Sequence, residues 1–455
     1  MCSKIKSFNI FRKSTFSSIW FVRTLNFAVF SLIFLSINNK FIGGGEYYFS
    51  TTLNDGAYTF HNFHILSNSM AYLAWLFATL FGIEISAFRA LQIASSIFAA
   101  LGATALVDLG MFWGLSFANS LLLGLPIIFC NGYLFYGTSV YPGFLATGLG
   151  LLAINILVRS ADARMPDKDN LKLLFIASIL LGLTNLMHLA FAVVIPALLI
   201  GMVFIAISNK KRLKYLNLVV YNFLIGIFLI LGLAYLVLLP ICLKYCPDQV
   251  AYLRPFENGV PNGLLITVLT GKIQTWLPSP ENFFTHLKTY GALLIPGVHS
   301  KNTILEIIFN IPRLLVVLLF SWFAIKAFKH RRENRDLFSW IVIFTGAFVS
   351  EFFFILFSGL LRCRQYASIS LSVLGPLFMA IFILFLKERK KFLILIFLCC
   401  LMFYSIFGIE GIVAITTYDN RPILAANSKC GFHIPKLVHL PFFPRSCFCS
   451  KMELN

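Results

Sequence analysis

The side chains best suited to catalysis lie in one polar stretch near the amino terminus. It contains two carboxylates and two imidazoles within 19 residues, namely Glu46, Asp55, His61 and His64. A carboxylate held at a membrane surface can act as a general base toward a hydroxyl or amine, and an imidazole can bind phosphate or carry a proton. A local explanation is also open, in which Asp55-Gly56 forms a turn and both histidines are solvated.

A second group of polar residues lies far along the chain, in a short turn between two apolar segments. There the sequence reads Arg362-Cys363-Arg364-Gln365-Tyr366. Two guanidiniums separated by one residue beside a bilayer are suited to hold a lipid-linked phosphate through paired hydrogen bonds. The alternative is that both side chains only extend to lipid headgroups.

Apolar segments must position these two groups, because the composition excludes a water-soluble protein. Of the 455 residues, 59% belong to the set AVILMFWYC and 12% are charged, and the mean hydropathy is +0.84. Soluble domains carry about 25% charged residues. The sequence therefore predicts an all-α, polytopic transmembrane helical bundle.

The net charge of +19 indicates topology. Of the 37 Lys and Arg residues, 21 lie in five clusters between apolar runs, at 4–13, 159–172, 210–214, 326–335 and 387–391. Short basic loops are retained on the cytoplasmic face of a membrane. We therefore assign the charge to membrane insertion and predict no nucleic-acid partner.

Helix length and the parity of these clusters predict about eleven spans. The first two clusters enclose five apolar stretches, and parity requires that one of them does not cross; they lie at about 19–37, 66–81, 87–108, 116–135 and 139–158. The second stretch is the shortest, so we predict that it is an interfacial or re-entrant helix.

The predicted organisation has three parts. Residues 1–18 form a cytoplasmic basic leader, residues 19–415 the transmembrane domain, and residues 416–455 a short tail on the outer face. Large loops at about 38–86 and 241–301 share that outer face. Later pairs of spans are expected to turn near 185–188 and 359–366.

Charged residues within the predicted spans are few, and we single out Arg89, Asp108, Arg313 and Glu351. Intramembrane charges are candidates for function, although one or two in a protein commonly serve only to pair helices. A proton relay would need a chain of such residues, and the sequence contains none.

The amino-terminal third resembles the GT-C membrane glycosyltransferases, which use polyprenyl-phosphate sugars. Asp55, Tyr58 and His64 precede a helix that ends at Gly82, and an Arg-led run rich in small residues follows at 88–102. This order is similar to that of the protein O-mannosyltransferase-like and lipid A aminoarabinose transferase-like groups.

Two later segments extend the resemblance over about residues 20–390. Residues 182–188 are similar to a Gly-Leu-led segment that ends in Thr-His before the sixth span of that fold. Residues 364–366, followed by Gly375-Pro376, resemble its late Arg-Tyr segment.

The resemblance implies an inverting glycosyltransferase on the periplasmic or lumenal face, with Asp55 as general base and Glu46 in reserve. It also implies a set of residues that bind the donor or its lipid phosphate: Tyr58, His61, His64, Arg89, His188, Arg362, Arg364 and Tyr366. The donor would be a polyprenyl-phosphate sugar and the acceptor a glycolipid, polysaccharide or protein. No further cofactor is assigned, and no residues are assigned to a metal; because no cluster of carboxylates demands a divalent ion, the sequence leaves metal dependence open.

The same resemblance implies a multi-pass protein of the bacterial inner membrane with a cytoplasmic amino terminus. A transporter or lipid flippase is the main alternative, since about eleven hydrophobic spans could equally build one. A purely structural polytopic protein is the third.

Overall fold

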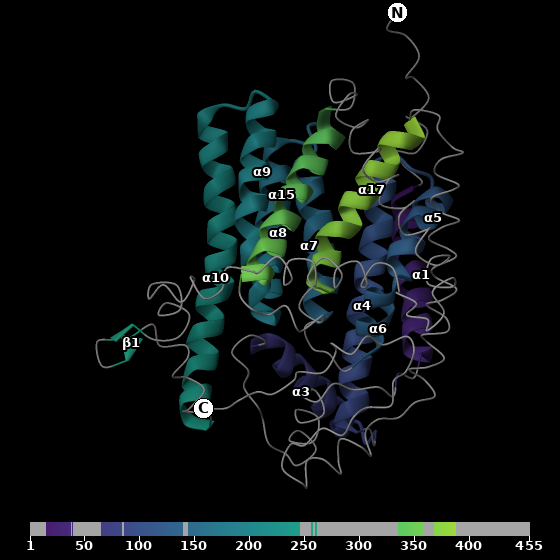
Figure 1. Ribbon diagram of the computed structural model, residues 1–455, viewed down its shortest axis with the longest axis vertical. Coiled ribbons are helices and arrows are strands. Elements are labelled where there is room, and N and C mark those ends of the chain that lie inside the picture. The colour runs from purple at the N-terminus through teal and green to yellow at the C-terminus, as the bar shows by residue number, and fades with distance from the viewer. Residues whose placement is uncertain are drawn as a thin grey trace, which may run out of the picture.

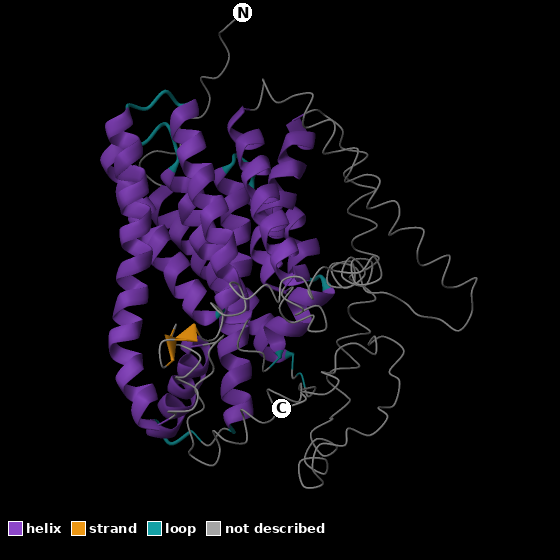
Figure 2. Ribbon diagram, turned by 60° about the vertical axis from the view of Figure 1, so that its left-hand side comes forward, coloured by secondary structure: helices purple, strands orange, loops and turns teal. Residues whose placement is uncertain are grey.

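The protein is an all-α bundle in the part of the chain that the structure describes (Figures 1 and 2). This computed structural model describes residues 15–37, 39, 65–83, 86–139, 144–245, 256–257, 260–261, 335–357 and 368–387. Eleven α-helices lie within these ranges, which confirms the all-α part of the predicted fold class.

The helices follow the predicted apolar segments. Their bounds are α1 (Thr15–Ser36), α3 (Ile65–Leu80), α4 (Ala87–Phe112), α5 (Phe117–Ile128), α6 (Asn131–Thr138), α7 (Phe144–Ser160), α8 (Asp167–Met187), α9 (Val194–Ser208), α10 (Leu213–Tyr245), α15 (Arg335–Phe357) and α17 (Leu371–Lys387). Two 3₁₀ helices complete the described bundle, η2 (Leu189–Val193) and η6 (Ser368–Ser370).

One pair of very short strands, β1 (Phe256–Glu257) and β2 (Val260–Pro261), was not predicted. The strands are antiparallel and lie in the second outer loop. The intervening Asn258-Gly259 is a dipeptide typical of hairpins, so a sequence signal was present.

Local sequence explains several helix boundaries. Ser86 begins α4 by accepting a hydrogen bond from the backbone of Arg89 at 3.2 Å, and Ser116 begins α5 in the same way. Such hydroxyls satisfy amides that have no partner in the first helical turn. At the end of α3, Gly82 has a φ of 68°, a conformation that glycine adopts without steric cost.

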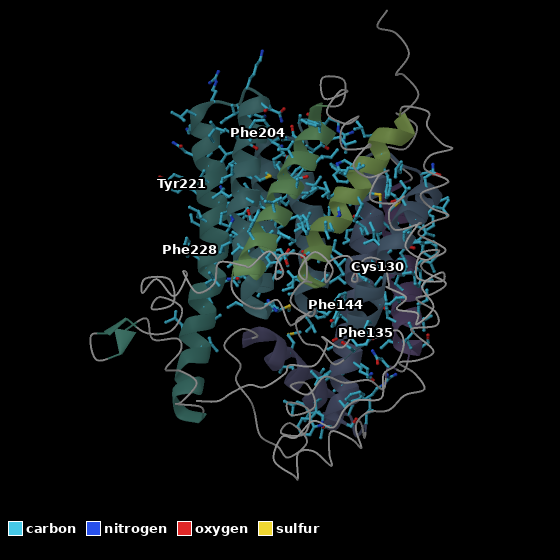
Figure 3. The ribbon with its side chains drawn as sticks, viewed as in Figure 1. Cys130, Phe135, Phe144, Phe204, Tyr221 and Phe228 are labelled. Atoms are coloured by element: carbon cyan, nitrogen blue, oxygen red, sulfur yellow. The ribbon has the colours of Figure 1, made fainter. Side chains whose placement is uncertain are left out.

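Several of these helices are suited to cross a membrane. Five are long and apolar enough, in α4, α8, α9, α10 and α15, and the bent pair α5/α6 would make a sixth. The outward face is apolar as well, with Phe204, Tyr221 and Phe228 exposed by 52%, 61% and 64% (Figure 3). Side chains of this kind on the surface fit lipid as the solvent.

The helix ends of the described bundle sort into two groups. Arg23 near the start of α1 contacts Asp108 near the end of α4, and Lys211 before α10 contacts Asp167 at the start of α8. We call the end that holds the 161–166 and 209–212 connections the inner end. The opposite end, which holds α3 and η2, is the outer end.

Helix α3 lies obliquely across the outer end, whereas the neighbouring helices run along the bundle (Figure 1). It has the predicted length of 16 residues. Met70 and Ala74 pack against a small cluster made by α4, α7 and the end of α8, namely Ala94, Leu145, Ala146, Leu149 and Met187. The interfacial or re-entrant position of this helix stays a prediction.

Two predicted boundaries need correction. The single span expected at 116–135 is two helices, α5 and α6, bent by 77° around Phe129 and Cys130. The span expected to end near Pro240 continues to Tyr245. At 33 residues, α10 is about 50 Å long, and it extends beyond the outer end of its neighbours (Figure 1).

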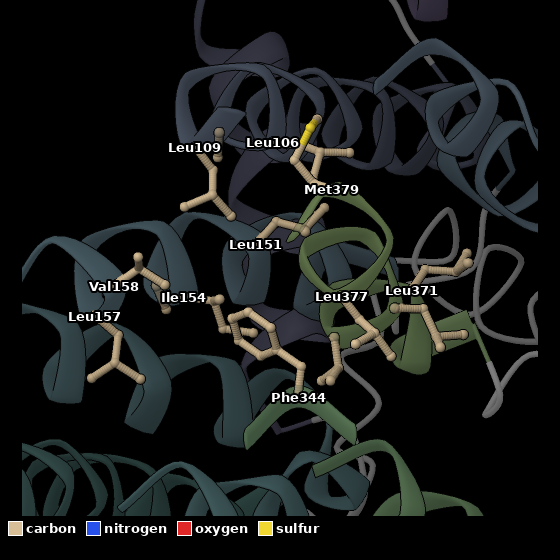
Figure 4. Packing of buried hydrophobic residues seen from close by; sticks show 14 of the residues in the cluster. Leu106, Leu109, Leu151, Ile154, Leu157, Val158, Phe344, Leu371, Leu377 and Met379 are labelled. Atoms are coloured by element: carbon tan, nitrogen blue, oxygen red, sulfur yellow. The ribbon is translucent and has the colours of Figure 1, made fainter. Parts of the chain in front are cut away.

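Helix α7 lies at the centre of the core. Its apolar side chains meet those of α4, α15 and α17, and the labelled members are Leu106, Leu109, Leu151, Ile154, Leu157, Val158, Phe344, Leu371, Leu377 and Met379 (Figure 4). Two glycines allow especially close helix contacts. A Cβ at Gly148 of α7 would overlap the carbonyl oxygen of Phe98 on α4, and one at Gly226 of α10 would overlap the Ser178 hydroxyl on α8.

Because of the close contact at Gly148, we expect one added methyl group to lower the stability of the protein. Gly148→Ala forces α4 and α7 apart, and we expect a loss of about 1–3 kcal/mol, as for overpacked cores. Gly346→Ala is the matched control, because a Cβ there meets nothing within 4 Å. Thermal unfolding of the detergent-purified protein measures both; equal unfolding temperatures would contradict the close α4–α7 contact.

Candidate functional site

The outer end of the bundle brings together the described segments that flank the predicted site. The starts of α4 and α7, the end of α8, and the helices α3, η2 and η6 all lie there. Residues 40–64 join the outer end of α1 to α3, so the first outer loop connects two elements at this end. Residues 358–367 likewise join α15 to η6.

Arg89 lies at the outer end of α4, as predicted, and it contacts protein groups. Its guanidinium donates to Gln92 Oε1 at 3.0 Å and to the carbonyl oxygen of Leu35 at 3.2 Å. Gln92 in turn donates to the carbonyl oxygens of Asn39 and Thr138. These contacts link the ends of α1 and α6 to the start of α4, which makes Arg89 a positioning residue in this geometry.

His188 lies where α8 gives way to η2, and its side chain is fully buried. Its backbone amide donates to the Thr184 carbonyl oxygen at 3.0 Å, and its own carbonyl oxygen accepts from Phe191 at 3.0 Å. The residue therefore terminates one helix and starts the next turn. Nearby, Asn185 is 8% exposed, and its Oδ1 atom has no hydrogen-bond partner within the described ranges.

The remaining predicted site residues lie outside the described part of the chain. In the first loop these are Glu46, Asp55, Tyr58, His61 and His64. In the late turn they are Arg362, Arg364 and Tyr366. Arg313, the leader before residue 15 and the tail lie outside it too.

Asp108 is the centre of a charged network at the inner end. It accepts hydrogen bonds from Arg23 Nε at 2.9 Å, from Arg159 Nη2 at 2.7 Å and from Asn155 Nδ2 at 3.0 Å. The network joins α1, α4 and α7. Arg23 was missed by the sequence analysis, although a lone basic residue within a predicted first span was a visible signal.

A more exposed pair lies in the neighbouring 161–166 connection. Arg164 donates to both carboxylate oxygens of Asp162, at 2.8 and 2.9 Å. Burial works to raise the pKa of Asp162, but the hydrogen bonds and positive charge of Arg164 outweigh it and leave the pKa below its ordinary value. The resulting stabilisation is present at neutral pH and is lost as the pH falls through that lowered pKa.

Glu351 differs from both acids because it is fully buried and has no charged partner among the described residues. It lies on α15 with an exposed fraction of 0%, and neither carboxylate oxygen makes a hydrogen bond of normal geometry within the described ranges. The hydroxyl of Ser370, in η6, interacts with it. No group of three or more potential metal ligands occurs among the described residues.

Together the fold and the apolar surface define a multi-pass integral membrane protein. Comparison with family models, with curated proteins and with solved structures found no match for this chain.

The Asp108 network predicts different effects for two neighbouring acids. Asp108→Asn leaves two guanidiniums without their carboxylate in a partly buried site, and we expect a loss of about 3 kcal/mol. Asp162→Asn, the control, removes a pair whose Arg164 side chain is 77% exposed, and should cost no more than about 1 kcal/mol. Thermal unfolding in detergent compares them, and a similar small effect for both would contradict the anchoring role of Asp108.

Proposed function

We propose that the protein is a membrane glycosyltransferase that moves a sugar from a polyprenyl-phosphate donor to a glycolipid, polysaccharide or protein acceptor. The reaction takes place on the outer face, above the outer end of the bundle. Asp55 is the general base, with Glu46 as the reserve. Arg362 and Arg364 bind the lipid phosphate, and His64 orients the phosphate or the acceptor.

The observation that carries this proposal is the oblique position of α3 across the outer end. The helix follows directly after the loop that contains the proposed base, and it packs on α4, α7 and α8 through Met70 and Ala74. A helix in this place ties an acidic loop to the membrane surface, where a lipid-linked donor presents its head group. The α15–η6 connection, with both arginines, leaves the bundle at the same end.

The chemistry needs one base and one group that stabilises the leaving phosphate. Asp55 removes a proton from the acceptor hydroxyl or amine, whose oxygen or nitrogen then forms a bond to the anomeric carbon. The bond from that carbon to the phosphate oxygen breaks on the opposite face, which inverts the configuration. The guanidiniums stabilise the negative charge that develops on the departing polyprenyl phosphate.

Two of the predicted donor-binding residues, Arg89 and His188, lie in the described part of the chain, and in this proposal they position the helices around the site. Arg89 links α1, α4 and α6 below the first loop. His188 holds the turn between α8 and η2, on which α3 rests through the neighbouring Met187. Tyr58, His61 and Tyr366 complete the donor-binding residues of the proposal.

A transporter or lipid flippase is the alternative, and two observations favour it. The α5/α6 pair is interrupted in the way that transporters interrupt helices at a binding site. Glu351 is a buried carboxylate within a span. Both features lie in the bundle, whereas the glycosyltransferase proposal places its reacting groups above it.

The test is a mass-spectrometric comparison of envelope glycolipids and glycans from a strain that lacks the protein, complemented with wild type or variants. We expect a sugar increment to disappear on deletion and to return with wild type. Asp55→Asn should lower transfer by about 100-fold or more, because it removes general-base catalysis. Asp169→Asn, in the first turn of α8 at the inner end, is the matched control and should restore the increment.

Two results would count against this assignment. Full restoration by Asp55→Asn would show that Asp55 is not the base. An unchanged set of glycans after deletion, together with accumulation of a lipid-linked precursor on the cytoplasmic side, would favour the flippase alternative.

A further inference from the structure

Glu351 lies in the outer half of a membrane span. It is the seventeenth residue of α15, which begins at Arg335, so it is about 24 Å along the helix axis from the inner end. Its neighbours on the helix are apolar, and Phe352 and Ala347 are themselves buried. Water and lipid headgroups therefore do not solvate this carboxyl group in the structure.

The described segments around Glu351 provide no counter-charge close to it. α15 packs against α9, α17, η2 and η6, and the sequences of α9, η2 and η6 contain no charged or titratable residue. The one such residue of α17 is Lys387, at its far end, and those of α15 itself are Arg335 and Asp336, in its first turn. His188 immediately precedes η2, and it is the one other titratable residue at the ends of these described segments.

A bare carboxylate in this position is strongly disfavoured. Burying an ionised carboxyl group without a partner costs several kcal/mol even after the protein relaxes. Asp108 avoids this cost through two guanidiniums and an amide. Glu351 lacks such partners in the described ranges, which leaves a proton or another bound cation to neutralise its charge.

The surroundings offer oxygen atoms for that cation. Ser370 interacts with Glu351 and is fully buried. Carboxylate, hydroxyl and carbonyl oxygens are ligands for hard cations.

We propose that Glu351, with Ser370 beside it, is an exchangeable binding site for one monovalent cation, H⁺ or Na⁺. Both neutralise the carboxylate in the same way, by an O–H bond or by coordination. The site does not depend on glycosyl transfer and goes beyond it. It gives the protein a means to sense or use the cation gradient across its membrane.

The first experiment labels the full-length protein in native membranes with dicyclohexylcarbodiimide, a hydrophobic reagent that reacts with protonated carboxyl groups. Mass spectrometry of the peptide containing residue 351 measures the labelled fraction at several pH values, in Na⁺ or in N-methylglucamine salt. For an H⁺ site the label decreases as the pH rises, with no effect of Na⁺. For a Na⁺ site, sodium at ten times its Kd reduces the label about tenfold.

Two variants test whether the label is on the Glu351 side chain. Glu351→Gln keeps the shape of the side chain and should lose the label while it elutes as a monodisperse protein. Asp336→Asn changes an exposed acid on the same helix and should leave the label unchanged. A label at the same peptide in Glu351→Gln would overturn the assignment.

Thermal unfolding provides a second measurement that does not need the reagent to enter the site. Raising the pH ionises Glu351 in the unfolded chain while the folded protein keeps its proton, so at an H⁺ site wild type should lose stability relative to Glu351→Gln, which cannot ionise. A Na⁺ site would instead stabilise wild type alone when sodium is added. If the label of wild type responds to neither pH nor Na⁺, the carboxyl group does not exchange its cation and the proposal is overturned.

Discussion

Lipid supplies no hydrogen-bond partners, and this constraint shapes α4 and everything that packs on it. The helix carries its anchoring polar contacts at its two ends, through Arg89 and Asp108, which are 19 residues apart. That separation is about 28 Å along a helix, close to the thickness of the hydrocarbon core of a bilayer, about 30 Å. Between the two anchors the helix presents small residues, and the close contact of Phe98 with Gly148 brings in α7.

The spans were predictable because hydropathy and basic clusters act over whole segments, and a segment of about 20 apolar residues has few alternatives in a membrane. The partners of single polar residues could not be predicted in this way. Arg23 pairs with Asp108 across 85 positions of sequence, and no local pattern encodes such a distance. The bend at Cys130 was missed although a local signal was present, because Asn131-Gly132 directly follows it.

At the candidate site, the helices could be predicted from the sequence better than the positions of single residues. The sequence indicated that α3 would not cross, since 16 residues are too few for a perpendicular span. Arg89 lies in the first turn of α4 and His188 directly follows α8. In the structure both residues make contacts that hold helix ends together, and neither position by itself indicates substrate binding. Loop residues such as Asp55 and Arg364 have no periodic pattern to fix them, because their positions depend on contacts between distant segments.

Buried polar groups in the described bundle differ in how they are partnered. At the inner end Asp108 has two guanidiniums and an amide as partners, so its role in the described bundle is to hold α1, α4 and α7 together. Glu351, toward the outer end, is buried without a charged partner among the described residues. Other buried polar atoms without a hydrogen bond in that part of the chain occur at Asn26, Ser31, Asn170 and Asn185, so a missing partner is not confined to one end. What distinguishes Glu351 from these amides and this hydroxyl is its charge. A neutral polar group without a partner costs less to bury than an ionised carboxylate, and for this reason a bound cation matters at Glu351 and not at the other four positions.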